Sequence, residues 1–160
     1  EDGGVVQLGT EGRWGGVGFA AVGRLQLRFD AGLWNEWFLL FDNGDQGWLG
    51  EAQGKYALSF KREATGPLPG YDELAVGRRL NLEGRAFTVT DLRTAEYLAA
   101  AGQLPFKPPL GEKAPLADLT AEAGGFATLD YSEGKPLLFL GRWATPEALA
   151  LTNLRIPEGW

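Results

Sequence analysis

The sequence predicts a mainly β protein built from two hairpin-rich lobes, each an SH3-like unit or a small barrel. Three observations lead to this class. Apolar and polar residues alternate through several stretches, as they do in strands with one buried face. Turns rich in Asp, Asn and Gly separate those stretches. The second half of the chain resembles the first, which indicates a tandem repeat. We expect at most one or two short helices.

Four strands are predicted in the first lobe, residues 1–63. Residues 19–29 alternate between an apolar or small face and a face that carries Arg24, Gln26 and Arg28. Residues 37–41 and 48–49 form the next two strands. Asn43 and Gly44 between them indicate a hairpin, because both residue types tolerate a positive φ. A fourth strand is expected over residues 55–61, where aromatic and aliphatic residues again alternate with polar ones.

Residues 64–70 contain two prolines and two glycines and are predicted to be a linker to the second lobe, residues 71–160. Residues 83–95 resemble residues 16–28, and residues 126–141 resemble residues 38–50. Residues 94–102 favour a helix by composition, but the repeat favours a strand, and we predict strand and hairpin through Leu98 because β context overrides propensity in short segments.

Residues 106–115 contain three prolines and are predicted to be an extended surface loop. Near the end, Thr145 is expected to cap a short helix over residues 146–150, with Pro146 at the first helical position.

The composition excludes several function classes. The chain has no cysteine and no histidine, so it can form neither disulfides nor His-dependent triads nor zinc sites of Cys and His, and we expect no cofactor. A net charge of −6 without a basic patch argues against nucleic-acid binding. With neither a membrane span nor a signal sequence, we expect a cytoplasmic protein. The absence of methionine predicts that the chain is part of a longer protein.

Residues 33–54 are the best candidate binding segment, because they combine three tryptophans with several carboxylates. The predicted binding residues are Trp34, Asn35, Glu36, Trp37, Asp42, Trp48 and Glu51. Flat aromatic rings bind sugars, bases or proline-rich peptides at a low entropic cost. The odd spacing of Trp34 and Trp37 places them on opposite faces of a strand. We therefore expect one of them in the core and the other partly exposed.

The carboxylates of the same segment offer an alternative. Glu36, Asp42, Asp45 and Glu51 could bind a divalent cation or supply an acid and a base. Their spacing matches no calcium loop, and an acidic turn that caps a hairpin accounts for the same residues. We therefore predict no metal ligands and no catalytic residues.

A family resemblance rests on specific strings. The stretch WNEW, then DNG, GWL and EAQG, together with LGTEGRW near the start, GQLPF at residues 102–106 and FATLDY at residues 126–131, resembles the bacterial domain of unknown function four-one-seven-eight. The resemblance covers nearly the whole chain. It implies a zinc-ribbon-like segment upstream in many members, and it implies no reaction and no catalytic residues.

The leading hypothesis is a non-enzymatic β module of a larger cytoplasmic bacterial protein, which binds another protein or a ligand. One alternative is a carboxylate-dependent enzyme or a metal-assisted hydrolase. The other is a small barrel that binds nucleic acid by aromatic stacking.

Overall fold

The protein is mainly β, as the sequence predicted. The computed structural model describes residues 4–30 and 32–156. Its strands are β1 (Glu11–Trp14), β2 (Val17–Phe29), β3 (Gly32–Phe41), β4 (Gln46–Ala52), β5 (Lys55–Arg62), β6 (Arg79–Leu82), β7 (Arg85–Gly102), β8 (Lys113–Ala121), β9 (Gly125–Glu133) and β10 (Lys135–Ala144). Two short 3-10 helices, η1 (Tyr71–Glu73) and η2 (Glu122–Gly124), interrupt them. No helix among the described residues has the length and apolarity needed to cross a membrane.

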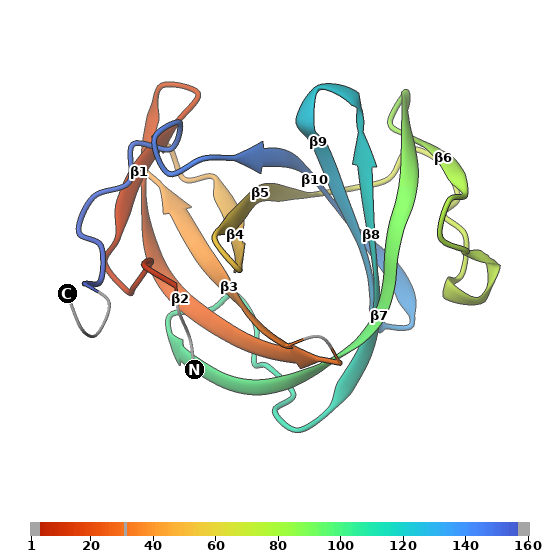
Figure 1. Ribbon diagram of the computed structural model, residues 1–160, viewed down its shortest axis with the longest axis horizontal. Coiled ribbons are helices and arrows are strands. Elements are labelled where there is room, and N and C mark those ends of the chain that lie inside the picture. The colour runs from red at the N-terminus through yellow and green to blue at the C-terminus, as the bar shows by residue number, and fades with distance from the viewer. Residues whose placement is uncertain (1–3, 31, 157–160) are drawn as a thin grey trace.

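Eight of the strands close into one antiparallel barrel in the order β2-β3-β4-β5-β10-β9-β8-β7 (Figure 1). Two pairings between the halves of the chain close the ring. β5 pairs with β10, with Phe60 opposite Leu140. β2 pairs with β7, with Leu27 opposite Tyr97. β1 and β6 lie outside the ring, each paired with the strand that follows it. Closure removes the free edges that an open sheet would expose.

The two halves share this barrel and do not form two separate ones. The predicted linker, residues 64–70, does lie between β5 and β6, but the strands on either side of it join the same ring. The tandem repeat is not confirmed. Residues 16–28 and 83–95 do fall on β2 and β7, the first barrel strand of each half. Residues 38–50, however, fall on β3 and β4, whereas residues 126–141 fall on β9 and β10, one strand out of step.

Several strands differ from the predicted ranges. β3 begins earlier than expected, at Gly32, and β8 begins at Lys113, inside the predicted loop. The prediction of a strand through Leu98 is confirmed, and β7 continues beyond it to Gly102. Thr145 does accept a hydrogen bond from the Ala148 amide, at 3.0 Å, but residues 146–150 form turns and not a helix. Ala150 has a φ of 51°, which ends any helical continuation.

Apolar residues are buried on both sides of the barrel wall. One cluster lies on the outer face of β2 to β5, where Trp37, Leu39 and Leu49 pack under Val6 and Leu149 from the ends of the chain. A second lies on the outer face of β7 to β10, beneath the segment that holds Leu74 and Leu82. A third faces the barrel interior and draws on both halves; its buried members are Leu25, Leu27, Trp34, Ala95, Tyr97, Ala114 and Leu116. Both faces are therefore stabilised by removing apolar surface from water.

Candidate functional site

The barrel interior contains a partly open cavity of about 80 Å³, called here the inner chamber. Every one of the eight barrel strands contributes at least one lining residue, and Phe106 from the β7–β8 loop contributes another. The walls are mostly apolar, with Leu25, Leu27 and Trp48 among them. Barrels of eight strands have interiors that side chains just fill or that hold one small ligand. The inner chamber shows that side chains do not fill this one.

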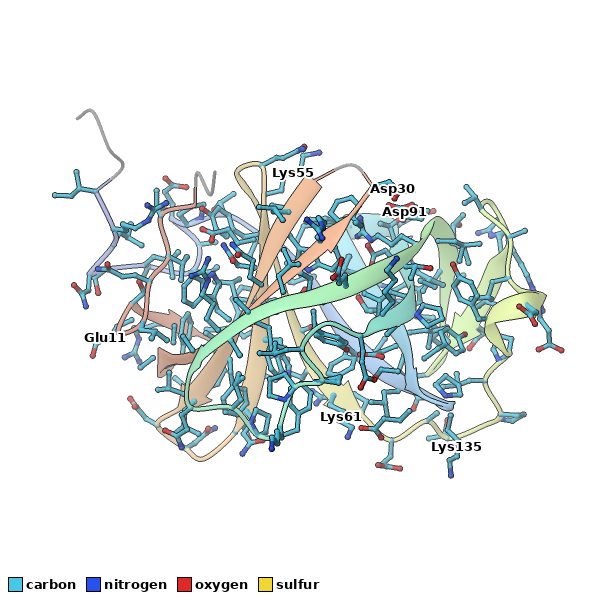
Figure 2. All side chains as sticks on the ribbon, turned by 90° about the horizontal axis from the view of Figure 1, so that it is seen from below. Glu11, Asp30, Lys55, Lys61, Asp91 and Lys135 are labelled. Atoms are coloured by element: carbon cyan, nitrogen blue, oxygen red, sulfur yellow. The ribbon has the colours of Figure 1, made fainter. Side chains whose placement is uncertain are left out.

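A wider pocket of about 430 Å³, called here the mouth, adjoins the inner chamber. The two share five lining residues, which are Trp34, Glu36, Ser59, Leu116 and Thr128. Lys55 and Asp91 border the mouth. Figure 2 shows them at one end of the barrel, with Lys61 and Lys135 toward the other. The interior therefore extends from the inner chamber to a pocket at one end.

Glu36 projects from β3 at the junction of the inner chamber and the mouth. The Trp34 indole Nε1 donates a hydrogen bond to Glu36 Oε2 over 2.7 Å. Opposite Glu36, β4 carries a glycine, Gly50, where a Cβ would lie 3.4 Å from Oε2. A Cβ at position 50 would therefore be in van der Waals contact with the carboxyl group.

Burial away from water raises the pKa of Glu36 to about 7. The hydrogen bond from Trp34 opposes this shift. Among the nearby charges, Asp118 and Asp130 raise the pKa further, whereas Arg93 lowers it. Desolvation also raises the pKa of Tyr97 to about 12, so this phenol stays neutral. A carboxyl group that titrates near neutrality inside a pocket is typical of functional sites.

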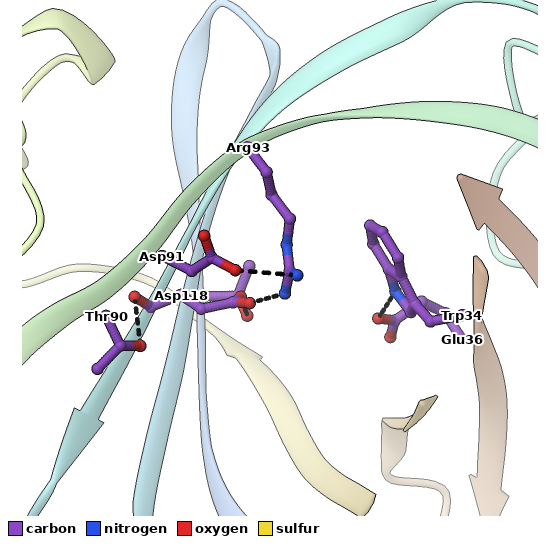
Figure 3. A network of polar contacts seen from close by, with 7 residues as sticks. Trp34, Glu36, Thr90, Asp91, Arg93 and Asp118 are labelled. Atoms are coloured by element: carbon purple, nitrogen blue, oxygen red, sulfur yellow. Dashed lines mark hydrogen bonds and ion pairs between the residues drawn. The ribbon is translucent and has the colours of Figure 1, made fainter. Parts of the chain in front are cut away.

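Arg93 of β7 organises the polar side of the mouth (Figure 3). Its guanidinium pairs with Asp91 at 3.1 Å and with Asp118. It also stacks on aromatic rings, 4.5 Å from the Phe29 centroid and 4.9 Å from that of Trp34. Asp118 accepts a further hydrogen bond from the Thr128 hydroxyl at 3.2 Å. Desolvation raises the pKa of Asp118, against the opposing charge of Arg93. The positive charge of Arg93 is thus already matched by carboxylates.

The structure divides the predicted binding residues between two faces of the wall and a turn. Trp34, Glu36 and Trp48 face the interior. Trp37 packs in the outer cluster, with Asn35 and Glu51 on the same side. The prediction that Trp34 and Trp37 point to opposite faces is confirmed. The prediction that one of them is partly exposed is wrong, because Trp34 and Trp37 are 7% and 3% exposed.

Glu51 is a buried anchor of the outer face and is 3% exposed. Its Oε1 accepts hydrogen bonds from Asn35 Nδ2 at 3.3 Å and from Trp37 Nε1 at 3.1 Å. Its Oε2 accepts from the Tyr56 hydroxyl at 3.2 Å and from the amides of Val5 and Val6 at 3.0 and 3.2 Å. Glu51 therefore ties the N-terminal segment to the barrel, and its oxygens are engaged in this structural task.

The acidic β3–β4 turn is exposed and bonded to itself. The Asp45 amide donates to Asn43 Oδ1 at 3.0 Å, and Asn43 Nδ2 donates to Asp45 Oδ2 at 3.2 Å. Asp42 lies in the same exposed turn. Glu36, Asp42, Asp45 and Glu51 therefore do not converge on one site. The described residues contain no group of three or more acidic side chains placed to hold a metal ion.

The sequence reasoning missed the interior polar residues of the second half. Arg93, Asp118 and Asp130 come from β7, β8 and β9 and meet Glu36 only because the barrel closes. A partial signal was available, since Asp118 and Asp130 each stand in an otherwise apolar run, ADL and TLDY. The run does not reveal which face of the strand is enclosed, so the signal could not identify a common cavity.

Replacing Glu36 by glutamine should remove a pH dependence of stability. An unfolded glutamate titrates near 4.5, and Glu36 in the folded protein titrates near 7. Between these values the folded state binds more protons, so this residue contributes stability at low pH that is lost as the pH rises through 7. The loss is about 3 kcal/mol at 1.4 kcal/mol per pKa unit. Urea unfolding from pH 4.5 to 7.5 should show a fall in the wild-type protein that is shallower in Glu36→Gln, and parallel curves would contradict the assignment.

Comparison with known proteins gives one match. A search of curated proteins and a search of solved structures both find nothing that matches this chain. The family model described as Domain of unknown function (DUF4178) matches residues 7–146, which include all eight barrel strands and the inner chamber. The chain therefore belongs to the DUF4178 family of domains of unknown function.

Proposed function

We propose that this domain is a non-enzymatic binding module that holds a small molecule inside its barrel, as part of a larger cytoplasmic bacterial protein. The observation that carries the proposal is the inner chamber, a cavity lined from all eight strands and adjoining the mouth. The setting in a larger bacterial protein rests on the family resemblance alone. A protein partner, which the sequence suggested, stays a prediction, and so does the nucleic-acid alternative.

The volume and the lining side chains of the mouth support ligand binding. The mouth, at about 430 Å³, lies within the range of about 300–1,000 Å³ that is usual for small-molecule pockets. Its walls combine aromatic rings with a few polar groups, among them Glu36, Arg93 and Asp118. Such pockets bind through apolar contact, and the polar groups orient the ligand. The exposed turn of Asp42 and Asp45 has no comparable enclosure.

A cavity-filling variant tests this proposal with cyclohexanol as a neutral probe. Ser59 lines both the inner chamber and the mouth, so Ser59→Phe should fill the space between them. We expect cyclohexanol to shift the indole N–H resonances of Trp34 and Trp48 saturably in the wild-type protein and not in Ser59→Phe. Ala75→Phe, which adds the same ring at an exposed position, should behave as the wild type.

Thermal unfolding must show that each variant is folded, and Ser59→Leu serves if Ser59→Phe is not. Shifts that never saturate, or that persist unchanged in the filled variant, would refute binding in the interior.

An enzymatic role is the second candidate, favoured by one observation. Glu36 and Asp118 both line the mouth, and both have raised pKa values. A protonated carboxyl beside an ionised one can act as an acid and a base. Hydrolysis of nitrophenyl esters and glycosides should then exceed the buffer rate and be lost in Glu36→Gln. Equal rates in both proteins would remove this candidate.

A further inference from the structure

We propose that the inner chamber selects a small organic cation, an ammonium group on a short apolar chain, with Glu36 as its counter-ion. This inference rests on the proposed function and adds the chemical class of the ligand. It is argued from the charge, the aromatic lining and the size of the chamber.

The charge of the chamber wall is negative. Among the described residues that line it, the charged side chains are Glu36 and Asp130, and no basic side chain is present. The basic group that influences Glu36 is Arg93, which lines the mouth and pairs with Asp91 and Asp118. Inside the chamber, an anionic ligand would therefore meet Glu36 and Asp130 with no basic side chain in the lining, because Lys55 borders only the mouth. A cationic ligand would neutralise a carboxylate that is costly to bury alone.

Glu36 has the hydrogen-bonding capacity for such a ligand. One of its oxygens, Oε2, accepts from the Trp34 indole. Within residues 4–30 and 32–156, no side chain or amide donates to the other oxygen, Oε1. An ammonium group carries three donors and can bond to this oxygen.

The remaining walls suit the rest of an alkylammonium ion. Trp34, Trp48 and Tyr97 line the chamber, and the faces of aromatic rings attract cations. Leu25, Leu27 and Phe139 provide apolar contact for a hydrocarbon chain. A single water needs about 10–15 Å³. A volume of about 80 Å³ therefore accommodates a ligand of roughly five heavy atoms.

The charge state of Glu36 makes binding depend on pH. An alkylammonium ion stays protonated up to pH of about 10, as lysine does. Glu36 ionises near 7, so affinity should increase by about tenfold between pH 6 and pH 8. The charged and titratable groups that influence Glu36 or Tyr97 beside it are Asp118 from β8, Asp130 and Glu133 from β9, and Arg93 from β7. At the mouth, Lys55 and Asp91 also face the interior.

Three probes of equal chain length test the inference: n-butylamine, 1-butanol and butyrate. The indole N–H of Trp34 reports binding directly, because it donates to Glu36. At pH 8 we expect butylammonium to bind with a dissociation constant on the order of millimolar, at least tenfold below that of 1-butanol. Butyrate should be weaker than both. At pH 6 the preference for the amine should fall about tenfold.

Glu36→Gln removes the charge of this side chain and nearly keeps its shape, so the variant tests whether the charge selects the ligand. It should lose the preference for butylammonium over 1-butanol. Glu96→Gln, which alters a carboxylate paired with Arg28 on the outer surface, should keep that preference.

The outcomes separate the two proposals. If 1-butanol binds as tightly as the amine at pH 8, or if the pH dependence is absent, the inference is wrong while the binding chamber stands. If none of the three probes and no cyclohexanol binds saturably, both the inference and the proposed function are wrong. The pH titration of the wild-type protein decides the matter even if Glu36→Gln does not fold.

Discussion

Glu51→Ala should lower the free energy of unfolding by about 4 kcal/mol, the largest effect expected in the outer layer. The substitution removes the acceptor of five hydrogen bonds from Asn35, Trp37, Tyr56, Val5 and Val6. These donors lie where the N-terminal segment meets the barrel wall, and each buried donor left unsatisfied costs about 1–3 kcal/mol. Urea unfolding measures the loss. Hydrogen exchange at the Val5 and Val6 amides should accelerate, because this segment loses its anchor.

Asp45→Ala provides the control, since it removes a carboxylate from the same hairpin at an exposed position. Its effect should stay within about 0.5 kcal/mol. Glu51→Gln keeps one acceptor oxygen and should fall between the two. If Glu51→Ala unfolded at the same urea concentration as the wild type, Glu51 would not be the anchor that its contacts indicate.

Gly141→Ala should destabilise the protein by about 3 kcal/mol or more by disturbing the β5–β10 seam. A Cβ at this position would lie 1.7 Å from the Leu58 carbonyl oxygen and 2.6 Å from the Ser59 Cα. These are backbone atoms, so relief requires the two strands to separate. This seam joins the halves of the chain, and Gly141 is paired there with Ser59. Calorimetry should record a large fall in the unfolding temperature.

Gly66→Ala is the matched control, because a Cβ there meets no atom within 4 Å and Gly66 has no positive φ in the structure. Its unfolding temperature should stay close to that of the wild type. A tolerated Gly141→Ala, with the wild-type unfolding temperature, would show that the strands of the seam are not packed this closely. Loss of the seam should also open the inner chamber, because Ser59 lines it.

Much of the β structure could be predicted from the sequence. The alternation over residues 19–29 did identify a strand, but the prediction that its apolar residues share one face is wrong. A register shift between Ala21 and Gly23 places Phe19 and Ala21 in the outer cluster, whereas Leu25 and Leu27 face the interior. Asn43 and Gly44 mark the β3–β4 turn because that turn requires a positive φ, which Gly44 supplies at 93°. Residues 32–36 were missed as a strand. They carry buried side chains on both faces of the wall, so they lack the alternation that marks a half-buried strand.

The candidate site was predicted only in part. Trp34, Glu36 and Trp48 do line the interior, and they were found because tryptophans and a carboxylate gather in one segment. Asn35, Trp37 and Glu51 come from the same segment and belong to the outer layer, because successive strand residues face opposite sides. Because these residues are close together in the sequence, the prediction combined residues of the interior and residues of the outer layer in one binding site.

Local patterns of alternation and turn residues were enough to establish a β protein with hairpins, and the specific strings of residues 33–54 were enough to indicate its family. Barrel closure and the meeting of Glu36 with Arg93, Asp118 and Asp130 depended on pairings between strands far apart in the chain. Such pairings leave no local pattern, because any apolar strand can pair with many others. The inner chamber exists only once all eight strands enclose it.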